Sequence, residues 1–430
     1  MIYSKDNTTK VTSLVQNSNF INKCRLKPTY FTRDRKMGPK EIACYLINKK
    51  GLSSKMEILK FNDIVDVKNI SAPAVLKQRE KFNPEALIYL KEESLKLLYT
   101  KHQSEVKNYK GYLLTAIDGS DLEIPNTPEA RRLYNGKSKT CARLTISLMY
   151  DLLNKYCLDC IIAPYDFSEI TMAKKHIRNI KGIMGEYKTI RIMDRGYPSL
   201  ESIYESLQND NKFIVRLSSK DYKKERSLMQ SDDEYIEIEY EYNRVKYYKE
   251  KNHKLYNYLK NGNTLRVRCI NIELDNGTIE TLLTNLEFEK YELKELYGLR
   301  WGIETNFHYL KESLKIEAIS SSKPILIEQE IHASILGFNM MQSYINDEEA
   351  KINQKLYKNQ MKINVNMAVG IIKDALILVL LEEDGETRSE LLAKILARIR
   401  KYVVPVKPNR KVPRKGNVKN KHHINKRKTF

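Results

Sequence analysis

Residues 112–118 read Tyr-Leu-Leu-Thr-Ala-Ile-Asp, an apolar run that ends in an acid. A short run of this kind, rich in β-branched and other apolar residues, predicts a buried strand. Residues 188–194, Lys-Thr-Ile-Arg-Ile-Met-Asp, follow the same pattern. We therefore expect two strands that each end at an acid, Asp118 and Asp194.

The surrounding sequence predicts the rest of an α/β core. Three further β-like runs and two helical segments, one of them beginning at Pro198, lie between the two strands and beyond them; the runs cover residues 143–152, 158–163 and 213–217, and the helices 170–183 and 198–209. Three strands, helix, strand, helix and strand is the order of an RNase H-like α/β core. Order alone is weak evidence, because many α/β folds share parts of it.

An antiparallel β insertion is expected after the fifth strand. Residues 236–242 alternate apolar or aromatic side chains with Glu, and residues 265–274 and 278–283 flank the turn signal Asp275-Asn276-Gly277. Helical patterns follow at residues 291–317, 328–344, 367–381 and 389–402.

The N-terminal part reads as short helices. They are expected at residues 40–48, after Ser54, after Ser71, and from Asn83-Pro84 to Tyr99. A helix pair that exposes Lys77, Gln78, Arg79 and Lys81 is compatible with a DNA-reading unit, although such pairs are also common in plain helical bundles.

Charge is the first indication of a partner. The 430 residues carry 75 Lys and Arg against 54 Asp and Glu, a net charge of +21. Residues 391–430 hold 14 of the basic residues and no acid, so the remainder of the chain has a net charge of +7. A basic tail of this density favours nucleic acid as the partner over a merely solubilising role.

Composition also bounds the compartment. The longest clean apolar run, residues 375–381, is too short to cross a bilayer, which needs about 20 residues. Six scattered cysteines make no disulfide framework, and Cys157-x-x-Cys160 lacks the second ligand pair of a zinc site. We expect a cytoplasmic, nucleoid-associated protein with no membrane partner, and, because no Gly-rich phosphate loop is present, no nucleotide cofactor.

Three acids are candidates for a shared metal site. Asp118, Asp194 and Glu304 supply the hard oxygen ligands that Mg²⁺ prefers, although singly each fits a turn, a loop ion pair or a helix surface. On a helical wheel Tyr297, Arg300, Glu304 and Lys311 fall within an arc of roughly 60°. That stripe borders an apolar arc, so it does not face bulk solvent.

Tyr-x2-Arg-x3-Glu-x6-Lys resembles the signature of bacterial insertion-sequence transposases of the DDE class, in the IS-four-like group that has a β insertion before the catalytic Glu. Residues 116–120, Ala-Ile-Asp-Gly-Ser, are similar to the family's first-Asp strand, and residues 193–197, Met-Asp-Arg-Gly-Tyr, to its second. The resemblance covers roughly residues 110–345. It implies that Asp118, Asp194 and Glu304 are catalytic and hold two Mg²⁺ ions, which Mn²⁺ can replace, and that Tyr297, Arg300 and Lys311 contact the DNA backbone near the cleaved end.

Two features depart from the family pattern. The one tryptophan, Trp301, lies inside the signature, so a flipped base would have to stack on a tyrosine within residues 222–258. His308 follows Glu304 by one turn and is more typical of a structural hydrogen-bonder than of a site residue.

The expected protein is a two-metal DNA transposase, which cuts element ends and joins their 3′-OH to target DNA. It would bind terminal inverted repeats and target DNA, and act as a homodimer because each end needs a catalytic centre. The alternatives are a domesticated or inactive DNA-binding relative and an RNase H-like nuclease without strand transfer.

The expected organisation places an RNase H-like catalytic core with an antiparallel β insertion between helical N-terminal and C-terminal regions. The segments are a DNA-binding helical region (1–108), the first part of the core (109–218), the β insertion (219–286), the second part of the core with the Glu helix (287–345), a helical C-terminal region (346–404) and a basic disordered tail (405–430).

Overall fold

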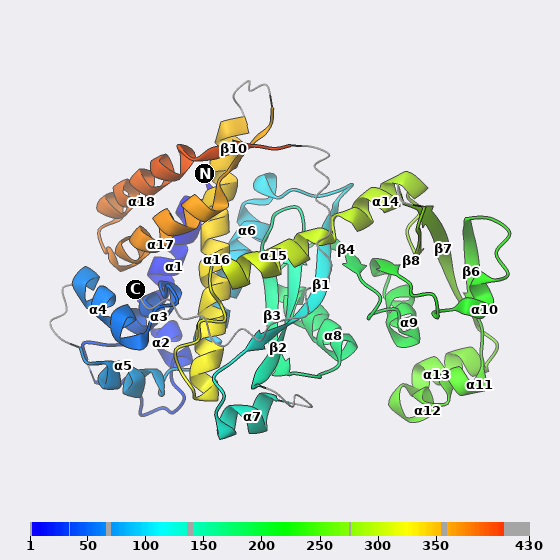
Figure 1. Ribbon diagram of the computed structural model, residues 1–430, viewed down its shortest axis with the longest axis horizontal. Coiled ribbons are helices and arrows are strands. Elements are labelled where there is room, and N and C mark those ends of the chain that lie inside the picture. Colours follow the sequence, from blue (N-terminus) through cyan, green and yellow to red (C-terminus); the bar gives the residue numbers. More distant parts are fainter. Residues whose placement is uncertain are drawn as a thin grey trace.

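The computed structural model describes residues 2–33, 35–65, 70–135, 141–274, 277–353 and 359–407. An eight-stranded mixed sheet, in the order β3-β2-β1-β4-β5-β8-β7-β6, forms its centre (Figure 1). The five strands of the core half are β1 (Tyr112–Glu123), β2 (Arg143–Asp151), β3 (Cys157–Pro164), β4 (Lys188–Met193) and β5 (Lys212–Arg216).

These five strands have the RNase H-like arrangement expected from the sequence. β1 pairs antiparallel with β2, and β2 antiparallel with β3, whereas β4 pairs parallel with both β1 and β5. The crossovers to the parallel strands contain helices, as is usual for connections between parallel strands. They consist of α8 (Glu169–Asn179) with a 3₁₀ turn at Ile180–Gly182, and α9 (Leu200–Gln208).

The first strand is longer than expected. The acid-terminated run predicted a strand that ends at Asp118, but β1 continues to Glu123 because Gly119 to Glu123 pair in register with β2, from Ser147 to Arg143. Asp118 therefore lies in the middle of a strand. A helix that was not predicted, α7 (Pro128–Tyr134), connects β1 toward β2.

The β insertion extends the same sheet. β8 (Ile279–Thr284) pairs antiparallel with β5 and forms the predicted hairpin with β7 (Leu265–Glu273), which pairs in turn with β6 (Asp233–Ile238). Residues 275–276 of the expected turn lie outside the described residues. Four short helices complete the insertion at the far end of the molecule (Figure 1): α10 (Lys223–Arg226), α11 (Tyr242–Val245), α12 (Tyr248–Lys251) and α13 (His253–Lys260).

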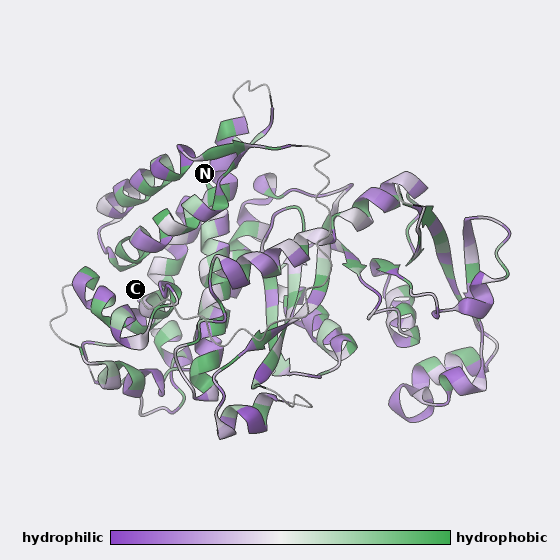
Figure 2. Ribbon diagram, in the orientation of Figure 1, coloured by the Kyte–Doolittle hydropathy of each residue, from purple (hydrophilic) through white to green (hydrophobic). Residues whose placement is uncertain are grey.

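Successive side chains of β1 point to opposite faces of the sheet and so belong to two separate apolar clusters. Leu114 and Ala116 belong to the apolar cluster shared with the helices that precede and follow the core, and Leu113 and Ile117 to the cluster on the α8 side. Hydrophobic residues accordingly fill the central strands, whereas α7 and α12 are largely hydrophilic (Figure 2). Even-numbered residues of β1 thus face the helix that carries Glu304.

That helix is broken, although the sequence predicts one helix over residues 291–317. α14 (Lys290–Gly298) and α15 (Trp301–Glu312) are joined by a tighter turn, in which Gly302 and Ile303 donate to the carbonyls of Leu299 and Arg300. Bonds to the third preceding residue are those of a 3₁₀ turn, and Gly298 lowers helix propensity just before it. The four residues of the signature therefore do not share one straight helix.

The 30-residue helix α16 (Pro324–Asn353) lies between the sheet and most of the N-terminal helices, and its central residues are buried (Figure 1). The N-terminal helices include the four predicted ones and two that were not predicted, α1 and α2. They are α1 (Tyr3–Val15), α2 (Ser18–Lys23), α3 (Pro39–Ile47), α4 (Ser54–Val65), α5 (Ala72–Arg79) and α6 (Glu85–Lys101), followed by a 3₁₀ turn at Gln103–Glu105.

One part of the expected DNA-reading surface is wrong. Arg79 is only 1% exposed, because its guanidinium forms a buried ion pair with Glu330 of α16, at 2.9 Å. Lys49 lies 2.7 Å from the other oxygen of the same carboxylate. Burial opposes ionisation of Glu330, but Lys49 and Arg79 lower its pKa to about 2. Arg79 therefore holds the N-terminal helices to the core, whereas Lys77 remains exposed.

The C-terminal part adds two helices and a small sheet. α17 (Val365–Leu381) and α18 (Gly385–Arg400) match the predicted helices, and β9 (Met361–Ile363) and β10 (Val403–Pro405) form an antiparallel pair that the sequence did not predict. Most of the expected basic tail, residues 408–430, lies outside the described residues. Within the described part of the chain, no helix is long and apolar enough to span a membrane.

Candidate active site

Strand register brings Asp118 and Asp194 side by side. In the parallel β1–β4 pair Ala116 is opposite Ile192, so the residue two positions further along each chain is one of the two acids. Neighbouring strands lie about 4.8 Å apart, and residues two apart share a face. Asp118 therefore faces the side of the sheet on which α15 packs, and Asp194 follows the end of β4 next to it.

Arg300 connects Glu304 to these strands. Its guanidinium forms an ion pair with Glu304 one turn later, and Nη1 lies 4.0 Å from Asp118 Oδ2. Arg300 is only 5% exposed although it precedes the first residue of α15. The guanidinium thus lies between two of the three predicted acids.

The other two residues of the signature also reach the sheet. The Tyr297 hydroxyl donates to Asp194 Oδ1 at 3.4 Å, and Lys311 Nζ donates to the backbone oxygen of Asp121 at 2.6 Å. Of the six predicted residues, the structure therefore gathers four around the fifth, Arg300, and places Lys311 two turns of α15 beyond Glu304, against β1.

Burial shapes the electrostatics of this cluster. Desolvation, with smaller contributions from the carboxylates of Glu169 and Glu304, raises the pKa of Asp118 to about 6 against the opposing effects of the Gly119 N–H and Arg300. Burial, followed by the charge of Asp194, likewise raises the pKa of Tyr297 to about 12. Concentrated negative charge of this kind is typical of a cation site.

A fourth acid in this cluster was missed by the sequence analysis. Glu169 is the first residue of α8, and its carboxylate lies against Gly119 and Gly196, which follow the two aspartates in the chain. In sequence, Ser168-Glu169 signals only a helix start, with Ser168 as the cap. The signal that could have identified Glu169 is the order of strands and helices, since the helix that Glu169 begins directly follows the third core strand.

The donor set fits a divalent cation, but the side chains do not enclose one as they stand. Among the described residues, no three His, Cys, Asp or Glu side chains are grouped closely enough to hold a metal ion. In the structure Glu304 is paired with Arg300, and a guanidinium and a cation would compete for the same carboxylate. Two buried polar atoms in this region, Arg300 Nε and Tyr197 Oη, have no hydrogen-bond partner in the described structure, which leaves donor capacity for a ligand.

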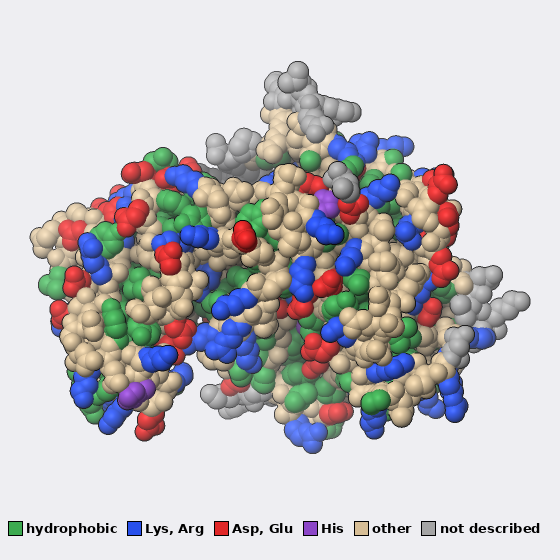
Figure 3. Space-filling view, turned by 180° about the vertical axis from the view of Figure 1, so that it is seen from behind, with side chains coloured by type: hydrophobic (Ala, Val, Ile, Leu, Met, Phe, Trp, Pro, Cys, Tyr) green, Lys and Arg blue, Asp and Glu red, His purple; other side chains and the backbone are tan. Residues whose placement is uncertain are grey.

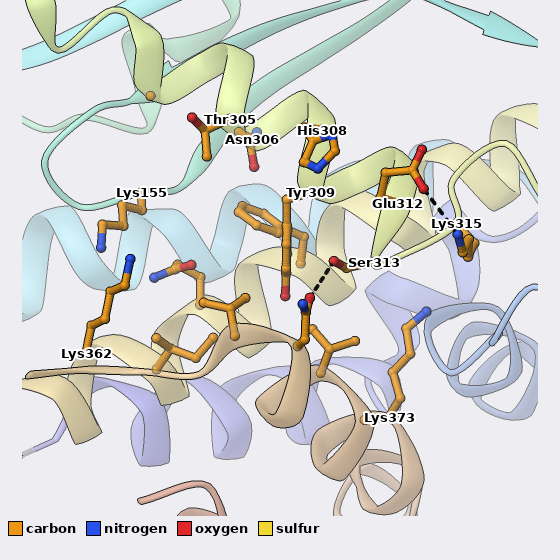
Figure 4. Close-up of a pocket in the computed structure, with 18 of the residues that line it drawn as sticks. Lys155, Thr305, Asn306, His308, Tyr309, Glu312, Ser313, Lys315, Lys362 and Lys373 are labelled. Carbon is orange, nitrogen blue, oxygen red and sulfur yellow. Dashed lines mark hydrogen bonds and ion pairs between the residues drawn. The ribbon is translucent and has the colours of Figure 1, made fainter. Parts of the chain in front are cut away.

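A separate cavity of about 860 Å³ lies on another face of α15, between that helix, α16 and α17. None of the four acids lines it. Lys155 and Lys362 reach one end of the cavity, Lys373 lies at the other, and His308 and Tyr309 of α15 line it (Figure 4). His308 thus belongs to this cavity and not to the acid cluster.

Aromatic side chains are exposed near the cluster and on the insertion. Trp301 is 51% exposed beside Arg300, whose guanidinium lies 5.8 Å from its ring centroid. Tyr242 and Tyr247, within the segment proposed for base stacking, are 62% and 64% exposed. Each of the three can be reached by a planar ligand.

Comparison with known proteins adds an independent finding. A family model described as "Transposase DDE domain" matches residues 109–340, which include the whole acid cluster. No curated protein matches the chain. Among solved structures, the cryo-EM structure of a piggyBac transposase synaptic complex with hairpin DNA is similar, with a TM-score of 0.47 and 11% identity over 90% of this chain and 85% of that chain.

Proposed function

The chain belongs to the transposase DDE domain family and is a DNA transposase, and we propose that Asp118, Asp194 and Glu304 form its catalytic centre. Enzymes of this family cleave DNA, transfer strands and use divalent metal. Strand β1, the residue that follows β4 and helix α15 supply the three carboxylates, and the β1–β4 register is the observation that carries the proposal.

These carboxylates would hold two Mg²⁺ ions, or Mn²⁺ in their place. When bound, such a pair activates the attacking oxygen of water or a DNA 3′-OH and stabilises the leaving oxygen of the phosphodiester. Asp118 and Asp194 supply fixed ligands from the sheet, whereas Glu304, whose side chain is 35% exposed, can turn away from Arg300. Phosphoryl transfer depends mainly on positioning and charge, so carboxylates without a covalent nucleophile suffice.

Tyr297, Arg300 and Lys311 would contact the DNA backbone near the cleaved end. Arg suits bidentate contact with a phosphate and Lys suits a point-charge contact. All three lie within the acid cluster or directly beside it. A phosphate held by them would therefore lie next to the carboxylates.

DNA would extend from this site over a basic surface. Lys and Arg side chains gather near the middle of the face shown in Figure 3, where the β insertion meets the core. We expect terminal inverted repeats and target DNA as ligands, two chains in the synaptic complex, and further DNA contacts from residues 1–108 and the basic C-terminal residues.

The test is cleavage of linear DNA that carries the native flanks, with purified protein in Mg²⁺ or EDTA. Wild type should cut at the repeat ends only with Mg²⁺, and Glu304→Gln should reduce cutting by at least about 100-fold. Glu312→Gln, an exposed acid two turns along the same helix, should cut as wild type does.

Three outcomes would contradict this assignment. DNA that is bound but uncut by wild type would indicate an inactive DNA-binding relative. Cutting that Glu304→Gln leaves unchanged would remove Glu304 from the centre. Cleavage without joining of the 3′-OH to a target would instead identify a nuclease.

A further inference from the structure

Glu169 lies against the two loops that carry the aspartates. A Cβ atom built on Gly119 would be 3.7 Å from Glu169 Oε1, and one built on Gly196 would overlap with Glu169 Oε2. Gly119 directly follows Asp118, and Gly196 follows Asp194 by two positions. Because consecutive Cα atoms are only about 3.8 Å apart, the Glu169 carboxylate is a near neighbour of both acids.

A buried hydroxyl lies in the same place. Tyr197 is 2% exposed, and its hydroxyl has no hydrogen-bond partner among the described residues. Burial raises its pKa well above 10, and the charges of Glu169, Asp118 and Asp194 raise it further. The phenol therefore lies among three carboxylates and bonds to none of them. A buried donor left unsatisfied costs about 1–3 kcal/mol, a cost that a ligand with its own water shell would remove.

From this geometry we propose that Glu169 is a fourth carboxylate ligand of the divalent-cation site, approaching from α8 while Glu304 approaches from α15. The inference rests on the proposed function, since it assigns a further ligand to the same site. Tyr197 is the positioning residue, because its hydroxyl is available to a metal-bound water or to the Glu169 carboxylate.

The two helices would each present one carboxylate to the cation. Mg²⁺ takes carboxylate oxygens together with retained waters, in octahedral geometry. In this structure Glu304 is held by Arg300, whereas Glu169 has neither an ion pair nor a side-chain hydrogen bond among the described residues and is exposed to solvent. Glu169 can therefore meet an incoming cation before Glu304 has turned.

Ordinary helix electrostatics is the competing explanation. An acid in the first turn of a helix is favoured by the macrodipole without any ligand. Glu129, an exposed acid in the first turn of α7 with Thr127 as the helix cap, has that role and lies outside the acid cluster of the site. Glu129→Gln is therefore the matched control for Glu169→Gln.

The experiment measures Mn²⁺ binding to the full chain without DNA, from the loss of the free-ion electron paramagnetic resonance signal. Glu169→Gln should weaken the affinity by about tenfold or more, in the range found when metal-site partners are removed. Glu129→Gln should bind as wild type does. Thermal unfolding in EDTA should show both variants folded.

A second variant, Gly196→Ala, keeps the negative charge of Glu169 but displaces its carboxylate. Gly196 does not have a positive φ, so Gly196→Ala is compatible with the backbone, and its Cβ must displace the flexible end of Glu169. We expect weaker Mn²⁺ binding from this change also, and little further loss when it is combined with Glu169→Gln.

The outcomes separate the two proposals. Unchanged Mn²⁺ affinity in Glu169→Gln, with a loss in Asp118→Asn, would overturn the role of Glu169 and leave the proposed function intact. Unchanged affinity in both variants would overturn the metal site itself.

Discussion

Replacing Arg300 with Met should destabilise the metal-free protein and should matter much less once the cation is bound. The guanidinium is the charge that neutralises Glu304 and faces Asp118 at 4.0 Å. Opposite unit charges at that distance interact by about 4 kcal/mol at an effective dielectric constant of about 20. The partly exposed pair with Glu304 adds up to about 1 kcal/mol. Removing the buried guanidinium also removes its own desolvation cost, so we expect a net loss of about 2–3 kcal/mol.

The assay is urea unfolding at pH 8, where Asp118 is ionised, followed by the fluorescence of Trp301. This tryptophan is the only one in the chain and is the first residue of α15, so it reports on the catalytic core. With saturating Mg²⁺ the difference between Arg300→Met and wild type should shrink below about 1 kcal/mol, because the bound cation replaces the lost charge. Arg268→Met, which breaks the Arg268–Asp233 pair of the insertion, should cost the same in Mg²⁺ and in EDTA. An equal loss for Arg300→Met under both conditions would show that the cation does not replace the charge of Arg300.

Two further predictions concern the core and the DNA contacts. Glu330→Gln should lower the free energy of unfolding by about 3 kcal/mol, because it leaves Lys49 and Arg79 buried without their carboxylate. The control in the same urea titration is Glu383→Gln, which removes an exposed carboxylate from its pair with Lys40. The pKa of Glu330 is lowered to about 2 in the folded protein. The stabilisation of the folded state by ionised Glu330 should therefore be complete above its unfolded pKa of about 4.5 and fade as the pH falls toward 2, with a total of about 3 kcal/mol. If Glu330→Gln lost stability with falling pH as steeply as wild type, this prediction would be contradicted. Lys311→Ala should reduce the slope of log affinity against log salt concentration by about 1 for DNA that carries an element end, because one phosphate contact is lost. The neighbouring Lys315→Ala should leave this slope unchanged. Equal slopes for Lys311→Ala and wild type would count against a phosphate contact by Lys311.

Strand patterns predicted most of what positions the site. The apolar runs before Asp118 and Asp194 predicted that each acid ends a strand of an RNase H-like core, and the parallel β1–β4 pairing, which these runs did not predict, brings the two acids together. This succeeded because burial and period are local properties of a sequence. The length of β1 was missed because the pairing of residues 119–123 with β2 depends on a partner strand and not on the apolar pattern.

Features that depend on distant partners could not be predicted. Arg79 looks like an exposed basic residue in its own helix, and its burial depends on Glu330, far along the chain. Glu169 looks like a helix start until the fold brings Gly196 against it. The break before Trp301 lies within a sequence whose periodicity continues through it, so only the hydrogen bonds of the folded chain reveal it.

The central claim is that Asp118, Asp194 and Glu304 converge on one divalent-cation site. It is tested most directly by loading the protein with Fe²⁺, adding peroxide and ascorbate, and mapping where the locally generated hydroxyl radicals cut the backbone. We expect cuts close to residues 118, 194 and 304, suppressed by excess Mg²⁺ and reduced in Asp118→Asn. Cuts confined to other segments, or cuts that Mg²⁺ does not suppress, would contradict it.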